Sequence, residues 1–196
     1  MLYLDRQREF PANLRKIICL LMNMEKLFLT HYYFPGTDPW KNIMLLSKEE
    51  AFRVAAELAA QHPDTASFGR FADFVNYYPL REEADRFVRE AFIQLGGSPK
   101  LPHPYCFTLM ECEYLRNWFS GGEKIVLDLS SLPDDQVSFT LGDSCALLSR
   151  KATATVLTKS MLLDQIRKAG SVEAFLKTLP EGYAYVEAQL WDRITG

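Results

Sequence analysis

Two ionisable side chains stand out because each lies in a stretch that is otherwise apolar and aromatic. His31 lies within Leu-Thr-His-Tyr-Tyr, and Glu187 lies within Tyr-Val-Glu-Ala-Gln-Leu-Trp. A carboxylate on such a strand face must be solvated in a cleft, paired with another group, or shifted in its pKa. These conditions are common at functional sites. The alternative places Glu187 and Gln189 on the solvent side of a half-buried strand, so both interpretations stand at this point.

A second candidate is Gly142-Asp143-Ser144, which resembles the nucleophile block of GDS-type lipases and esterases. Such a serine needs a histidine as its general base, and these enzymes carry it downstream. All three histidines, His31, His62 and His103, precede the block. Because glycine and aspartate both favour turns, we interpret the block as a turn after a strand.

The chain has four cysteines and no C-x-x-C pair, so neither a disulfide framework nor a zinc site is predicted. We expect free, mostly buried thiols and a cytoplasmic protein. Cys145, close to Asp143, would be a thiol nucleophile if His31 or His103 lay beside it. A buried structural thiol is the simpler interpretation. The four are Cys19, Cys106, Cys112 and Cys145.

Composition restricts the class of partner. The 196 residues are 48% hydrophobic and 24% charged, with a net charge of −3. One globular core of this size folds without disulfides or metals. The charges are interspersed, as in the segment 81–86, which reads as a solvated helix face. No nucleic-acid partner is indicated, since a basic stripe is missing. No membrane association is expected either, because the apolar run 17–22 is too short to span a bilayer.

The elements that must position these residues follow an α+β pattern. We predict a single domain with a mostly antiparallel sheet and a group of helices inserted after the first strand. Residues 1–23 are an N-terminal extension or a helix, and 24–196 form the domain. Alternation and turn residues predict strands at 27–34, 105–109, 124–129, 137–141, 154–158 and 183–191. Helical spacing and capping predict helices at 48–61, 68–77, 81–95, around 114–118, 161–169 and 172–179.

The order of these elements resembles the ADP-ribosyltransferase superfamily of the diphtheria-toxin-like kind. That family carries a histidine in its first core strand and a glutamate in a late strand. The resemblance implies that His31 hydrogen-bonds the nicotinamide ribose of NAD. It also implies that Glu187 stabilises the oxocarbenium-like ribose as nicotinamide departs, because a carboxylate offers negative charge where positive charge develops.

The same resemblance implies further NAD-binding residues. The segment Ser138-Phe139-Thr140 resembles the family's middle strand, which carries a stacking or hydroxyl residue. Tyr32 is one candidate for a stacking tyrosine, with Tyr33 and Tyr105. Gln189 lies two residues beyond Glu187 on the same strand face and would line the same cleft.

Two functions therefore follow from the sequence. The first is an NAD-binding, ADP-ribosyltransferase-like enzyme that transfers ADP-ribose or cleaves NAD, and it requires His31 and Glu187 to share a cleft with a free aromatic face. The second is a non-enzymatic domain that binds a protein partner or a metabolite. It predicts a solvent-facing Glu187, an apolar patch elsewhere and aromatic anchors. The candidate anchors are Trp40, Tyr77, Tyr78 and Trp118.

Overall fold

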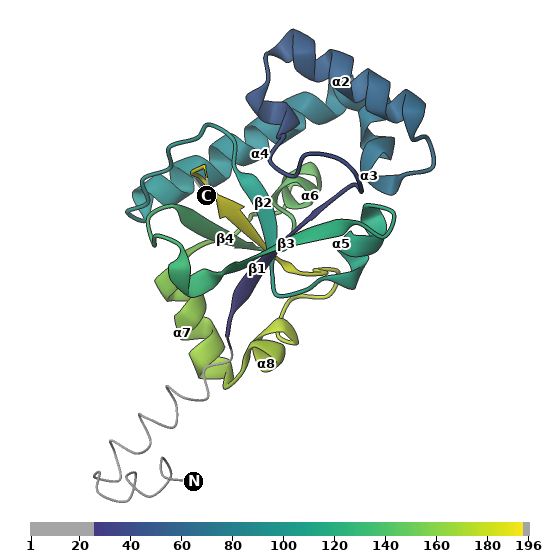
Figure 1. The fold of residues 1–196 in the computed structure, drawn as a ribbon. Helices are drawn as coiled ribbons and strands as arrows, with labels where there is room; N and C mark the ends of the chain where they lie inside the picture. Colours follow the sequence, from purple (N-terminus) through teal and green to yellow (C-terminus); the bar gives the residue numbers. More distant parts are fainter. Residues whose placement is uncertain (1–25, 194–196) are drawn as a thin grey trace, which may run out of the picture.

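The structure, a computed structural model, describes residues 26–193 and contains one six-stranded sheet (Figure 1). The strand order is β3-β1-β2-β6-β4-β5, and every neighbouring pair is antiparallel. The predicted α+β class and the antiparallel sheet are confirmed. The predicted extension or helix at 1–23 lies outside the described residues. The strands are β1 Phe28–Tyr33, β2 Tyr105–Leu109, β3 Glu123–Asp128, β4 Val137–Leu141, β5 Val156–Thr158 and β6 Val186–Leu190.

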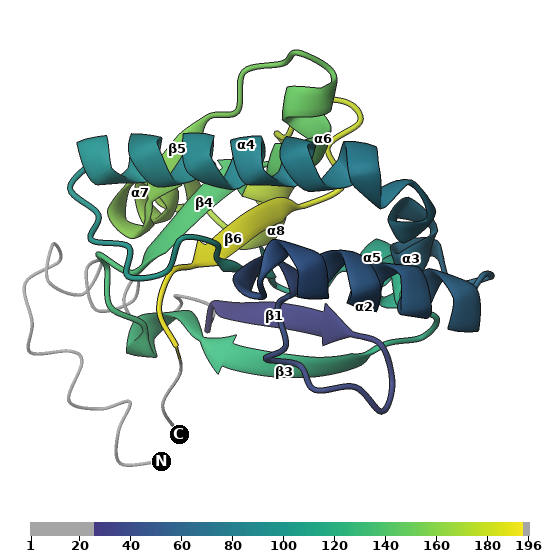
Figure 2. The same ribbon diagram turned by 90° about the horizontal axis from the view of Figure 1, so that it is seen from above.

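The helices cover both faces of the sheet. Helices α2, α4 and α6 lie on one side, and α7 and α8 lie on the other (Figure 1). Seen from above, α4 crosses the sheet (Figure 2). No helix within residues 26–193 has both the length and the apolar character needed to cross a bilayer. The helices are α2 Lys48–Gln61, α3 Ala66–Gly69, α4 Phe74–Gln94, α5 Glu113–Trp118, α6 Ser144–Ser149, α7 Lys159–Ala169 and α8 Val172–Leu176, with 3-10 turns η2 Ile43–Leu45, η3 Arg70–Asp73 and η4 Leu129–Ser131.

The sheet face below α7 and α8 is apolar. One row of paired residues crosses four strands: Phe107, Ala188, Phe139 and Leu157. These side chains are buried with Leu162 of α7 in the largest hydrophobic cluster of the protein. Burial of apolar surface at about 25 cal/mol per Å² makes this face the main source of stability.

The opposite face is polar although it is equally buried. Its register aligns Thr30, Thr108, Glu187 and Thr140 across β1, β2, β6 and β4. Glu187 is only 3% exposed. The predicted alternation along β6 is therefore correct, but the interpretation of a solvent-facing Glu187 is wrong. The reason is that a second helical layer, with α4 and α6, covers this face.

The inserted helices differ from the sequence prediction at Pro79. Two helices, 68–77 and 81–95, were expected, whereas α4 runs without a break from Phe74 to Gln94 through Pro79. Proline removes one backbone donor from the helix interior. Phe74 and Tyr78 pack into a cluster with Met44 and Ala51, and this tertiary burial holds the helix together across the proline.

The segment 142–144 is the predicted turn, and it also begins a helix that the sequence analysis missed. Gly142 adopts a φ of 95°, a conformation open to glycine. Asp143 then caps α6, since its Oδ1 accepts the backbone N–H of Ala146 at 2.8 Å. The block is thus a strand-to-helix turn that projects Asp143 from the polar side of the sheet.

Candidate active or ligand-binding site

A cavity of about 800 Å³ is bounded by β1, β2, α2, α4, α5 and α6. We call it the site cavity. Its lining takes in Thr30 and Glu187 from the polar face of the sheet, and His31 and Phe107 from the other face. Its volume falls within the range of small-molecule sites. Many apolar side chains line it together with six charged residues: the exposed Asp38 and Lys41, and the less exposed Arg70, Arg81, Asp143 and Glu187. The aromatic part of its wall includes Phe34, Phe68, Phe71, Tyr77, Trp118 and Phe119.

Glu187 is held firmly at this cavity. Its Oε2 accepts the backbone N–H of Ser144 at 2.8 Å and the amide of Gln189 at 3.1 Å, with the hydroxyl of Thr140 at 3.4 Å. Burial raises the pKa of Glu187 and the charge of Asp143 adds to this, while Arg81 and the Ser144 amide oppose it. Glu187 therefore takes up a proton more readily than a glutamate in water.

Asp143 and Tyr185 form the neighbouring part of the cavity. The Tyr185 hydroxyl donates to Asp143 Oδ2 at 2.9 Å. Burial raises the pKa of Tyr185, and the nearby charges of Asp143 and Glu187 raise it further. Tyr185 thus remains a neutral phenol that can donate one hydrogen bond, and Asp143 already accepts it.

Arg81 lies between Glu187 at the cavity and Asp85, one turn further along α4. Its Nη2 lies 2.8 Å from Asp85 Oδ1 and its Nη1 lies 3.9 Å from Glu187 Oε1. Burial opposes the charge of Arg81, but the Asp85 carboxylate above all keeps the pKa of Arg81 well above its usual value. The prediction of a solvated helix face at 81–86 is therefore wrong for Arg81 and Asp85, which turn inward.

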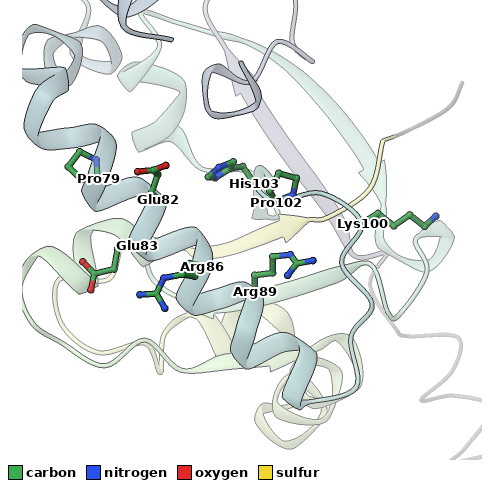
Figure 3. Close-up of a pocket in the computed structure, with 8 residues that line it drawn as sticks. All are labelled: Pro79, Glu82, Glu83, Arg86, Arg89, Lys100, Pro102 and His103. Atoms are coloured by element: carbon green, nitrogen blue, oxygen red, sulfur yellow. The ribbon is translucent and has the colours of Figure 1, made fainter. Parts of the chain in front are cut away.

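Asp85 also contacts His103, which lines a second pocket beside α4. His103 Nδ1 lies 2.8 Å from Asp85 Oδ2, and His103 lines this pocket with charged residues of α4 (Figure 3). A continuous series of polar contacts therefore runs from His103 through Asp85 and Arg81 to Glu187. His103 is therefore paired with a buried carboxylate and does not lie beside Cys145 as a base, since its contact is Asp85. The other lining residues are Pro79, Glu82, Glu83, Arg86, Arg89, Lys100 and Pro102.

His31 has a different environment from the predicted one. Its Nδ1 lies 2.7 Å from the carbonyl oxygen of Cys106 and its Nε2 lies 3.0 Å from that of Pro39. Burial lowers the pKa of His31, and the two carbonyl contacts oppose this. The strand register places His31 on the opposite sheet face from Glu187, although both residues line the site cavity. Both ring nitrogens are thus occupied by the protein itself.

The four predicted NAD-binding residues besides His31 divide into two groups. Tyr32 lines the site cavity, and its hydroxyl accepts the backbone N–H of Cys112 at 2.9 Å. Ser138, Thr140 and Gln189 do not line it. Ser138 donates to Gln189 Oε1 and Gln189 Nε2 donates to Thr140, both at 2.9 Å. This network also holds Glu187 in place, because Gln189 Nε2 donates to Glu187 Oε2 at 3.1 Å.

The thiols behave as predicted where the structure describes them. Cys106, Cys112 and Cys145 are free, and Cys19 lies outside the described residues. Cys145 lines the site cavity, and burial raises its pKa to about 11. It is therefore a protonated thiol at neutral pH. Its burial fits the structural interpretation better than that of a nucleophile.

Sequence analysis missed Arg70, Arg81 and Asp143. The i, i+4 spacing of Arg81 and Asp85 was a usable signal for an ion pair on one helix face. Asp143 also carried a signal, since an aspartate before an apolar run is a typical N-cap. No local pattern marks Arg70.

Comparison of the chain with protein-family models, curated proteins and solved structures finds no match. Within residues 26–193 no three metal-ligating side chains converge. The functional argument therefore rests on the site cavity itself.

Proposed function

We propose that this protein binds a small organic metabolite in the site cavity. One observation carries the proposal: three residues that line the cavity each have a buried polar side-chain atom without a hydrogen-bond partner in the described part of the chain. These atoms are Thr30 Oγ1, Ser67 Oγ and Trp118 Nε1. Buried polar groups are nearly always paired, and an unpaired one costs about 1–3 kcal/mol. A bound molecule would supply the missing partners.

The remaining wall supports a ligand that is partly apolar. Phe34 and Phe68 lie with ring centroids 5.2 Å apart, and Phe68 and Phe71 lie 5.7 Å apart. Such surfaces favour aromatic or aliphatic groups, while a few polar atoms fix the orientation. The cavity thus combines apolar area with a small number of directed hydrogen-bonding groups.

This proposal keeps the metabolite-binding part of the second alternative drawn from the sequence, although the solvent-facing Glu187 that it predicted is wrong. His31 and Glu187 both line the site cavity, as the first alternative required. ADP-ribosyl transfer or NAD cleavage remains a prediction that rests on the resemblance and on the position of Glu187 at the cavity. Oε2 of Glu187 is occupied by protein donors, and both nitrogens of His31 contact backbone carbonyls. NAD is therefore tested as one metabolite among others.

A thermal melt with a panel of metabolites, NAD included, tests the proposal. A ligand that binds only the folded state raises the melting temperature by mass action. Ser149 lines the cavity and is exposed, so Ser149→Trp should obstruct it with little effect on the core. Arg150→Trp is the matched control, because Arg150 is exposed and not part of the cavity lining.

We expect ligand-induced shifts in the wild type and in Arg150→Trp, and a much smaller shift in Ser149→Trp. Equal shifts in both variants would place binding outside the site cavity and contradict the proposal. A panel that shifts none of the three proteins would leave it without support.

A further inference from the structure

We propose that the ligand of the site cavity carries an anionic group, a carboxylate or a phosphate, which binds to Arg70, Ser67 and Trp118. This inference rests on the proposed function and names the class of ligand. The occupant we infer is a small molecule with an aromatic or aliphatic body and one such group.

The first step is the charge balance of Arg70. Its Nη1 donates to the Tyr77 hydroxyl at 2.9 Å and its Nε donates to the Ser67 carbonyl at 3.2 Å. Both acceptors are neutral. Among residues 26–193 no carboxylate oxygen lies within 4.0 Å of Arg70, and its Nη2 has no hydrogen-bond partner. Burial opposes the charge of Arg70, but Tyr77 and the more distant Asp143 keep the pKa of Arg70 raised. Arg70 therefore stays charged without a directly contacting carboxylate from the described residues, and an anionic ligand would supply that contact.

Arg81 provides the internal contrast. It lines the same cavity, but Asp85 at 2.8 Å neutralises it. Of the two arginines at the cavity, only Arg70 thus lacks a carboxylate of residues 26–193 within ion-pair distance. Arg70 lies on η3, lines the cavity and donates to the neutral Tyr77 hydroxyl of α4.

The second step is the set of donors beside Arg70. The Arg70 guanidinium lies over the Trp118 ring, 5.3 Å from its centroid, and over the Tyr77 ring at 5.1 Å. Trp118 Nε1 and Ser67 Oγ are buried polar atoms, unpartnered among the described residues, of two residues that line the cavity. Arginine and the indole N–H donate but never accept hydrogen bonds. A set dominated by such donors selects an acceptor-rich group, which a carboxylate or a phosphate is.

The third step is the body of the ligand. Aromatic rings enclose the donor set: Tyr77 and Trp118 flank the guanidinium, and Phe68 and Phe71 stack beside each other on the same wall. Inorganic phosphate would leave these surfaces uncovered. An organic acid or phosphate ester would bury both its charged and its apolar part.

Titration calorimetry with matched probes tests the inference. The probes are 3-phenylpropionate, its neutral amide and phenyl phosphate, in Tris chloride buffer so that no other carboxylate or phosphate competes. Both anions should bind the wild type at least about tenfold more tightly than the amide, a ratio equal to about 1.4 kcal/mol. The two anions share the phenyl ring and differ in charged group and linker, and their order of affinity indicates which of the two acids fits the site better.

Arg70→Met should abolish the preference for the anions over the amide. Arg86→Met is the control, because Arg86 is an exposed arginine that does not line the site cavity, and it should keep the preference. Trp118→Phe keeps the ring and removes one donor. We expect it to weaken anion binding about threefold to tenfold, as for one hydrogen bond, so it tests the same donor set if Arg70→Met does not fold.

The result that overturns the inference is equal binding of the acid and the amide to the wild type. If Ser149→Trp then blocks both probes, the proposed metabolite site stands and only its anion selectivity is lost. Absence of binding by all three probes also overturns the inference, and the metabolite panel decides separately whether the cavity takes any ligand.

Discussion

The two faces of the sheet are built from the same strands and are buried to the same degree, yet their chemistry is opposite. Phe139 and Ala188 are paired on one face, whereas Thr140 and Glu187, one residue along, are paired on the other. All four are at most 3% exposed. The apolar face stabilises the fold by burial alone. The polar face must satisfy each hydrogen-bonding group individually, and within residues 26–193 it does so around Glu187 but leaves Thr30 Oγ1 unpaired.

The largest expected effect lies on the apolar face. Phe139→Ala should lower the free energy of unfolding by about 3–5 kcal/mol, because it removes a fully buried ring and leaves a cavity. Urea denaturation measures this change. Val126→Ala is the control, since Val126 is 48% exposed on the edge strand β3, and it should have little effect. A small loss for Phe139→Ala would show that this face is not the main source of stability.

A smaller effect is expected for the neighbouring residue on the polar face. Thr140 donates to the Gly142 carbonyl and accepts from Gln189 Nε2, both at 2.9 Å. Thr140→Val keeps the shape and removes both bonds, so unfolding should become easier by about 1–3 kcal/mol. The same urea series measures it. A loss as large as that of Phe139→Ala would mean that the polar network, not apolar burial, dominates the sheet.

The smallest expected effect is a change in pH dependence. Burial raises the pKa of folded Glu187 above its ordinary value of 4.5. The stability that this group contributes is therefore complete below pH 4.5 and falls as the pH rises through the raised pKa. Glu187→Gln removes the titration, so its stability relative to the wild type should increase with pH. Each unit by which the pKa of folded Glu187 is raised corresponds to about 1.4 kcal/mol of this change in stability.

Unfolding of both proteins measured from pH 4 to pH 8 checks the sign, with about pH 4.5 as the start of the divergence. Parallel curves would mean that Glu187 has an ordinary pKa. Curves that diverge in the opposite direction would mean that Arg81 and the Ser144 amide outweigh burial and the charge of Asp143.

Much of the fold could be predicted because its signals are local. Alternation gives all six strands, with ends displaced by a few residues, and Ser47 caps α2 as expected, since its hydroxyl accepts the Glu50 N–H. Two errors have tertiary causes. The break at Pro79 is overridden by packing, and α6 is too short to show helical periodicity.

The site was only partly predictable for a related reason. Glu187 stands out because a charge interrupts an apolar strand. Arg81 and Asp85 carried only the i, i+4 spacing of an ion pair, and the role of Arg70, which depends on the groups that the fold brings near it, has no local signature. His31 is the opposite case: its sequence context suggested a ligand-binding residue, whereas the carbonyls of Cys106 and Pro39 occupy its ring.

The pairing of β1 with its neighbours has a consequence for how the molecule responds to a bound ligand. Only two residue pairs join β1 to β2, whereas six join β1 to β3. Beyond Thr30 the His31 ring contacts the Cys106 carbonyl where strand pairing has ended. The sheet thus contains a seam, and residues from both of its sides, Tyr32 and Cys106 among them, line the site cavity. A molecule that contacts both sides would stabilise the closed seam. By linkage, opening of the seam would weaken the binding of that molecule by the same free energy.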